Sequence, residues 1–286
     1  MKASHGHLIS CCLSEIERQK KRPVSESPVR ILDAGCGKGR LIADLMVELE
    51  GTEGLENVEL YGFEVLEHGA CHHSYLPEVL AALSGRLPGV DWKRRIRVVS
   101  TDDPWPFDDD SFDLVVSNQV IEHVADLGWF FEQMRRVLRP NGISIHHFPT
   151  AESLADPHSG VPFAHWPESD FRKASVIRLF SQLGCGKFRH YRRERGHSLD
   201  DFVDEFVDYL KRYTHFRSFA DVARVAKRTG LAVSARYNWA LFQRWLSGDA
   251  IVYPYSTRFG DSLFTRALLR VASGTIVCQK LERELY

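Results

Sequence analysis

Apolar residues in the first half of the chain occur in two alternating patterns. Short apolar runs at 29–34, 58–65, 96–99, 112–117 and 143–148 have the length and composition of buried strands. Between them, apolar residues recur at helical spacing in 41–49, 69–83 and 127–138, and an N-terminal helix is expected at 5–22. This alternation predicts an α/β fold with a doubly wound, mostly parallel sheet and helices on both faces.

The regular alternation of predicted strands and helices ends after residue 148. A helix at 219–228 and strands at 231–237 and 275–281 complete a seven-stranded sheet. Two longer insertions, 150–215 and 239–272, separate these elements. Within them, apolar residues have helical spacing at 199–213 and 261–271. We therefore expect an N-terminal helix and linker over 1–28 and one domain over 29–286. Its two insertions would form a lid or substrate pocket, with the lid following strand five.

Composition narrows the class of protein. Hydrophobic residues make up 44% of the 286 residues, enough for a sizeable core, and the net charge of −1 argues against a large nucleic-acid footprint. The six cysteines form no C-x-x-C pair, so we expect free thiols in a reducing compartment. Neither a signal peptide nor a membrane span is evident, and a cytoplasmic location is expected. The oligomeric state stays open.

The segment 31–40, ILDAGCGKGR, joins the first strand to the helix that follows it. Its glycines permit positive φ and close approach of a ligand to the backbone, although a tight turn in another nucleotide-binding fold would look similar. The segment resembles motif I of class I, Rossmann-like S-adenosylmethionine-dependent methyltransferases. That resemblance implies that Asp33, Gly35, Cys36, Gly37 and Gly39 hold the amino-acid end of S-adenosylmethionine.

Three further segments extend the resemblance over about residues 29–148, towards the type 11, ubiquinone-biosynthesis-like group. Glu64 ends the second strand, where a carboxylate can bind two ribose hydroxyls, although a solvated strand-end acid is the alternative. In the stretch 100–116, Thr101 replaces the family's usual acid, so Asp102, or else Asp103, is expected to contact the adenine. Asn118 and Gln119 follow the fourth strand and complete the expected cofactor site.

Histidines are the candidate catalytic residues, because a hydroxyl acceptor benefits from a base. His123 follows the fourth strand, although Glu122 and His123 could simply begin a helix. Some relatives bind a divalent metal through an E-x-x-E-H pattern. Here Gln119 replaces the first glutamate, so no metal site is expected.

His158 and His165 lie in 149–167, a segment that interleaves proline, glycine, aromatic and imidazole groups. It reads as a lid or pocket wall, in which Phe163 and Trp166 could stack on a sugar or another ring; a packed surface loop is the alternative.

These features predict an enzyme that transfers a methyl group from S-adenosylmethionine to a small molecule, leaving S-adenosylhomocysteine. The expected acceptor is a hydroxyl oxygen of a sugar or sugar-containing metabolite. One alternative is an RNA or protein methyltransferase, although the N-P-P-Y and D-P-P-Y signatures of base amino methylation are absent. A non-catalytic module that binds S-adenosylmethionine is the other.

Overall fold

The computed structural model describes residues 3–20, 28–50, 52, 57–67, 74–247, 255 and 273–281. They form a seven-stranded sheet with the order β3-β2-β1-β4-β5-β7-β6. Its strands are β1 (Val29–Ala34), β2 (Val58–Val65), β3 (Ile96–Val99), β4 (Phe112–Asn118), β5 (Leu138–Phe148), β6 (Leu231–Ser234) and β7 (Gly274–Lys280). Strands β1 to β5 pair in parallel, and β7 is antiparallel to both β5 and β6. The expected mostly parallel, doubly wound sheet is confirmed.

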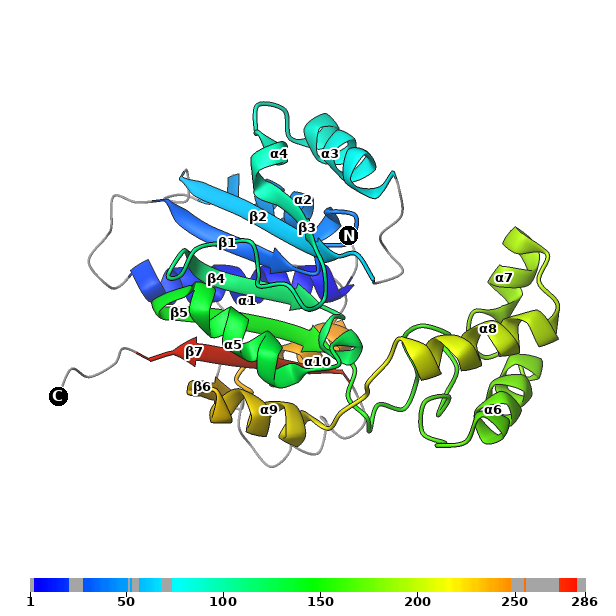
Figure 1. Ribbon diagram of the computed structural model, residues 1–286. Helices are drawn as coiled ribbons and strands as arrows, with labels where there is room; N and C mark the ends of the chain where they lie inside the picture. Colours follow the sequence, from blue (N-terminus) through cyan, green and yellow to red (C-terminus); the bar gives the residue numbers. More distant parts are fainter. Residues whose placement is uncertain are drawn as a thin grey trace.

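Helices cover both faces of this sheet (Figure 1). They are α1 (Ala3–Lys20), α2 (Arg40–Glu50), α3 (Tyr75–Arg86), α4 (Trp92–Arg95), the 3-10 helix η1 (Ile121–His123), α5 (Leu127–Val137), α6 (Asp170–Gln182), α7 (Phe188–Arg195), α8 (Leu199–Arg212), α9 (Phe219–Arg228) and α10 (Asn238–Ser247). Side chains alternate between the faces along each strand. On β1, Ile31 packs in the core under α1 and α2, whereas Leu32 packs in the core under α5 and α9.

Three local expectations differ from the structure. The helix expected at 69–83 begins at Tyr75, which places Pro77 in its first turn, where a missing N–H breaks no helical hydrogen bond. Residues 139–142 lie between the helix expected at 127–138 and the strand expected at 143–148, but they are part of β5, with Asn141 at φ +63° and a register shift between Phe112 and Leu114. The strand expected at 231–237 ends at Ser234.

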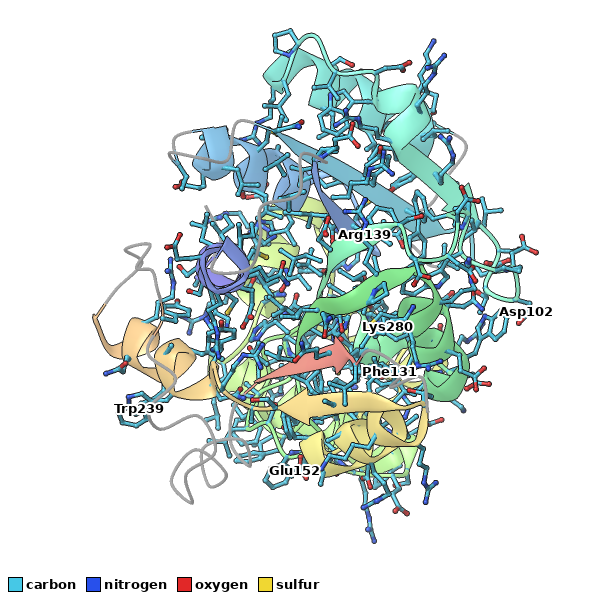
Figure 2. All side chains as sticks on the ribbon, turned by 90° about the vertical axis from the view of Figure 1, so that its left-hand side faces the viewer. Asp102, Phe131, Arg139, Glu152, Trp239 and Lys280 are labelled. Carbon is cyan, nitrogen blue, oxygen red and sulfur yellow. The ribbon has the colours of Figure 1, made fainter. Side chains whose placement is uncertain are left out.

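Contacts on both sides explain why β5 starts so early. Arg139 Nη1 donates a hydrogen bond to Asp113 Oδ2 at 2.7 Å, and Lys280 Nζ donates to the Leu138 carbonyl at 2.7 Å. Arg139 and Lys280, both labelled in Figure 2, thus bind the segment to β4 and β7. The turn-like sequence is therefore accommodated as an irregularity within the strand.

The first insertion has a hydrophobic core of its own. Helices α6, α7 and α8 project from one side of the sheet core in Figure 1. Ile177 of α6 and Phe202 and Phe206 of α8 are buried in one cluster with Val161 of the preceding loop. The insertion is thus a packed helical unit rather than a loosely patterned excursion.

The second insertion is described only from Asn238 to Ser247 and at Tyr255. The helix expected at 261–271 and Cys71 lie outside the described residues. Among the described helices, none combines the length and the apolar character needed to cross a membrane.

Candidate active site

A cavity of about 1020 Å³ lies at the carboxyl ends of β1, β2 and β4. Ligands of open α/β sheets bind at this edge, where the strand order reverses. The loops after β1, β3 and β4 line one part of the cavity, and Arg212 and Tyr213 at the end of α8 line another. The sheet core and the first insertion therefore share one pocket.

The glycine loop after β1, which contains Gly35 and Gly37, lines the cavity. Gly35 has φ +78°, and a Cβ atom there would lie 2.6 Å from Val120 Cγ2, so glycine is required on both conformational and steric grounds. The backbone N–H groups of Gly35 and Cys36 both donate to the Phe63 carbonyl, at 3.0 and 2.9 Å, which joins the loop to the end of β2. The loop thus has a fixed backbone, and its glycines leave room for close contact with a cofactor.

Glu64 lies across this loop. Its Oε2 accepts a hydrogen bond from the Gly37 N–H at 2.7 Å, and its Oε1 accepts one from the Val65 N–H at 3.0 Å. The carboxylate is nearly buried and lines the cavity. Each carboxylate oxygen has a further lone pair for a ligand, so the group can still accept from paired hydroxyls.

Asp33 is the second buried carboxyl group beside the loop. Burial, together with the neighbouring Glu64 carboxylate, raises the pKa of Asp33 to about 8 from an ordinary value of 3.8. A nearby cation would lower it again, because opposite charge favours the ionised form. A sulfonium compound bound at this end would therefore favour ionisation of Asp33.

The loop after β3 forms the expected adenine end. Thr101 and Asp102 line the cavity, whereas Asp103 is not among the described residues that line it. Asp103 Oδ2 instead accepts from the Ser100 N–H at 3.3 Å and shapes the loop. Thr101 donates through its N–H to Glu67 Oε2 at 3.0 Å. Glu67 also lines the cavity and is a residue that the sequence did not single out.

Asn118 and Gln119 face the middle of the cavity at the end of β4. Gln119 has φ +56°, uncommon for a residue with a side chain, and its N–H donates to the His147 carbonyl at 2.8 Å. Among the described residues, Asn118 Oδ1 and the nearby Trp129 Nε1 are buried polar atoms without a hydrogen-bond partner. Both side chains line the cavity, so a ligand can supply what these atoms lack.

The three candidate histidines occupy different places. His123 lines the cavity, and its Nδ1 lies 2.5 Å from the Tyr213 carbonyl oxygen. His158 lies behind it, with 3.3 Å between the two Nε2 atoms. His165 stacks on Phe216, with ring centroids 4.3 Å apart, and burial lowers its pKa. Neither His158 nor His165 is among the described lining residues.

Most of the cofactor residues proposed from sequence meet in this cavity. Asp33, Gly35, Cys36, Gly37, Glu64, Asp102, Asn118 and Gln119 all line it. Gly39 lies one turn behind, with φ +67° and its N–H bonded to the Cys36 carbonyl at 2.9 Å, so it shapes the loop. His5 of α1 and Arg212 and Tyr213 of the insertion also line the cavity, and no local sequence signal marked them.

Comparison with known proteins agrees with this geometry. The family described as methyltransferase domain matches residues 7–233. The human mitochondrial ubiquinone biosynthesis O-methyltransferase is 31% identical over 114 residues, which cover 40% of this chain and 27% of that protein. The malonyl-[acyl-carrier protein] O-methyltransferase of Halorhodospira halophila is 30% identical over 125 residues, covering 43% of this chain and 36% of that protein. The matches thus span about a third of these relatives' length.

A solved structure covers more of the chain. The S-adenosylmethionine-dependent methyltransferase of Mesorhizobium loti aligns over 93% of this chain and 97% of that one, at 15% identity and a TM-score of 0.47. The family match spans the glycine loop, the acid at the end of β2 and the loop after β4. The chain therefore belongs to the methyltransferase domain family, and its sheet has the class I, Rossmann-like strand order.

Proposed function

We propose that this protein transfers a methyl group from S-adenosylmethionine to a hydroxyl oxygen of a small polar acceptor, such as a sugar or sugar-containing metabolite. The observation that carries the proposal is the pair of unpartnered buried atoms, Asn118 Oδ1 and Trp129 Nε1, in the wall of the cavity. One is a hydrogen-bond acceptor and the other a donor, and a hydroxyl group can satisfy either. A polyol offers several hydroxyls to such a wall.

The shape and composition of the pocket support the same proposal. A volume of about 1020 Å³ is at the upper end of the range for small-molecule sites, which leaves room for an acceptor beside the cofactor. Tyr213 and Trp129 supply aromatic surface for a ring, and Asp126 adds another acceptor. Both relatives compared above are named as O-methyltransferases, which favours oxygen as the methylated atom.

Alignment is the main catalytic requirement, because the sulfonium methyl group is already activated. Of the three candidate histidines, we propose that His123 acts nearest the acceptor, since it lines the cavity and the other two do not. His158 contacts it from behind.

The test is a methyl-transfer assay with S-adenosylmethionine and a panel of monosaccharides, nucleotide sugars, phenols and carboxylic acids. We expect S-adenosylhomocysteine to form with a sugar-containing acceptor and the product to carry an O-methyl signal in NMR. His123→Ala should lower kcat, and His190→Ala, on the exposed side of α7, should not. Turnover confined to phenols or carboxylic acids would overturn the acceptor assignment.

A further inference from the structure

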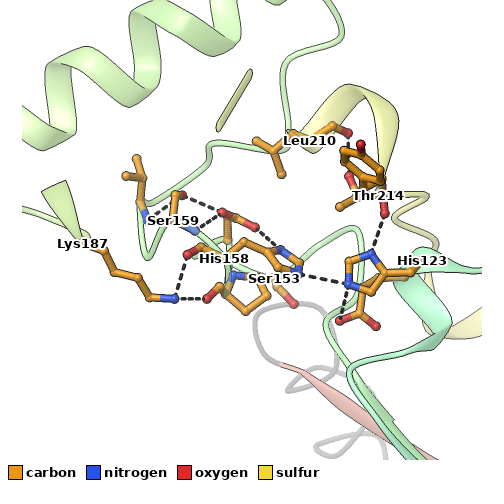
Figure 3. A network of polar contacts seen from close by, with 12 residues as sticks. His123, Ser153, His158, Ser159, Lys187, Leu210 and Thr214 are labelled. Carbon is orange, nitrogen blue, oxygen red and sulfur yellow. Dashed lines mark hydrogen bonds and ion pairs between the residues drawn. The ribbon is translucent and has the colours of Figure 1, made fainter. Parts of the chain in front are cut away.

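His123 and His158 face each other where the first insertion meets the sheet core (Figure 3). Glu122 lies beside them. Glu122 and His123 belong to η1, whereas His158 lies in the loop between β5 and α6. One ligand atom from each lies within 4.8 Å of the other two. The Nε2 atoms of the two histidines are 3.3 Å apart, and Glu122 Oε1 lies 4.0 Å from His123 Nε2.

The outer hydrogen bonds determine which ring nitrogens carry protons. His123 Nδ1 contacts a carbonyl oxygen, which can only accept, so this nitrogen is the donor. His158 Nδ1 lies 3.0 Å from Asp156 Oδ1. Asp156 Oδ2 accepts a hydrogen bond from the Ser159 N–H at 2.6 Å, and an ionised carboxylate can only accept, so His158 Nδ1 is the donor in this contact.

With Nδ1 as the donor in each ring, a neutral ring presents an Nε2 lone pair, and the two Nε2 atoms face each other. Two such lone pairs at 3.3 Å repel unless a proton or a metal ion lies between or beside them. Two nitrogen ligands of a tetrahedral ion, each at about 2.0–2.1 Å, are themselves about 3.3 Å apart. The spacing in the structure thus matches one edge of a tetrahedral metal site.

Glu122 completes the donor set. Its side chain is 1% exposed, and neither carboxylate oxygen has a hydrogen-bond partner among the described residues. A buried carboxylate beside two imidazole lone pairs is a donor set that divalent transition metals favour.

We propose that Glu122, His123 and His158 bind one divalent transition-metal ion such as Zn²⁺. Asp156 and the Tyr213 carbonyl are the outer groups that orient the two imidazoles, as is usual for metal-bound histidine. The ion would join the insertion to the sheet core and lie beside the cavity, which His123 lines. Asp156 itself is held by the Ser159 N–H at 2.6 Å.

Glu122 and His123 are the last two positions of the E-x-x-E-H pattern that is interrupted at Gln119, and His158 is the ligand that the pattern does not contain. His158 and the outer group Asp156 both come from the insertion and are separated from His123 by more than 30 residues. The expectation of no metal rested on the missing carboxylate at position 119. It took no account of a ligand from the insertion.

Titration of chelator-treated protein with Co²⁺ tests the proposal without any acceptor. We expect the intense visible bands of tetrahedral Co²⁺, displaced by Zn²⁺, at about one equivalent per chain. The isosteric Glu122→Gln and the variant His158→Ala should abolish these bands. Asp156→Asn should weaken Co²⁺ binding about 10–100-fold, as is typical for groups that orient metal ligands.

The matched control is His197→Ala, because His197 also lies beside a carboxylate, with its Nδ1 3.3 Å from Glu205 Oε2. This variant should bind Co²⁺ as the parent protein does. Circular dichroism and S-adenosylhomocysteine binding would establish that each variant is folded. Absence of the bands in the parent protein, or their persistence in folded Glu122→Gln and His158→Ala, would overturn the metal site and leave the methyl-transfer proposal intact.

Discussion

The cavity has two walls of different construction. The wall at the ends of β1 and β2 is largely backbone, fixed by Gly35 and Gly37 at positive φ and closed by Glu64. The opposite wall consists of side chains from the loop after β4 and from the end of α8. A backbone wall suits a ligand that never changes, whereas a side-chain wall can vary with the acceptor. Under the proposed function, the methyl donor and the acceptor would thus be recognised by different kinds of structure.

Replacing one buried phenylalanine in the sheet core and one in the core of the first insertion should give the largest difference between these two regions. Phe131 of α5 and Phe202 of α8 are both fully buried, and their replacement by alanine should each cost about 3–5 kcal/mol. Phe131→Ala should lower the stability of the sheet core and with it the binding of S-adenosylhomocysteine. Phe202→Ala should loosen α6 to α8 and reduce methyl transfer, while cofactor binding persists.

Hydrogen exchange and calorimetry on both variants would provide the comparison. Loss of protection confined to the insertion in Phe202→Ala is the expected result. Equal loss of protection over the whole chain in both variants would mean that the two cores unfold as one unit.

The backbone wall can be tested at Gly35. Alanine there combines the strain of a left-handed residue, about 1–2 kcal/mol, with a Cβ contact of 2.6 Å to Val120. Overpacking adds about 1–3 kcal/mol, so we expect a lower Tm and cofactor affinity below detection in calorimetry. The control is Gly89→Ala, which has φ +93° but open space around the added atom. It should show the strain alone and bind cofactor normally.

Glu64 tests the carboxylate that closes this wall. Glu64→Gln removes the charge that accepts from the Gly37 N–H and would accept from ribose hydroxyls. Hydrogen bonds to a charged group contribute about 1.5–3 kcal/mol, so S-adenosylmethionine affinity should fall about 10–150-fold. Glu67→Gln is the matched control, because Glu67 also lines the cavity but its oxygens are engaged by Ser100 and Thr101. An equal loss of affinity in both variants would contradict a ribose role for Glu64.

The difference between the two walls also explains which site residues could be predicted from the sequence. Gly35, Glu64 and Asn118 each lie at the end of a strand, so a short stretch of sequence specifies both the residue and its place. His123 contacts His158 and Tyr213, which lie 35 and 90 positions further along the chain, so no local sequence pattern specifies these contacts. The insertion's core was missed for a related reason. Its buried residues alternate with charged ones that face solvent, and only the packing of α6 on α8 reveals a shared interior.

The pKa of Asp33 gives the smallest expected difference between the two walls of the cavity. Its folded pKa of about 8 exceeds the ordinary value of 3.8, so its contribution to stability is complete below about pH 3.8 and is lost as the pH rises through 8. Cofactor binding has the opposite sign. A sulfonium cation beside Asp33 favours the ionised carboxylate, so affinity for S-adenosylmethionine should increase between about pH 6 and 8, by at most about tenfold per pH unit.

Calorimetry across this pH range, with Asp33→Asn as the comparison, measures that effect. The variant should show a flatter pH dependence, because its side chain does not ionise. S-adenosylhomocysteine lacks the sulfonium charge and should show a weaker dependence than S-adenosylmethionine with the parent protein. If the two ligands respond equally to pH, Asp33 does not sense the sulfonium. The charge preference of the backbone wall would then arise from the amino-acid end of the cofactor, which both ligands share.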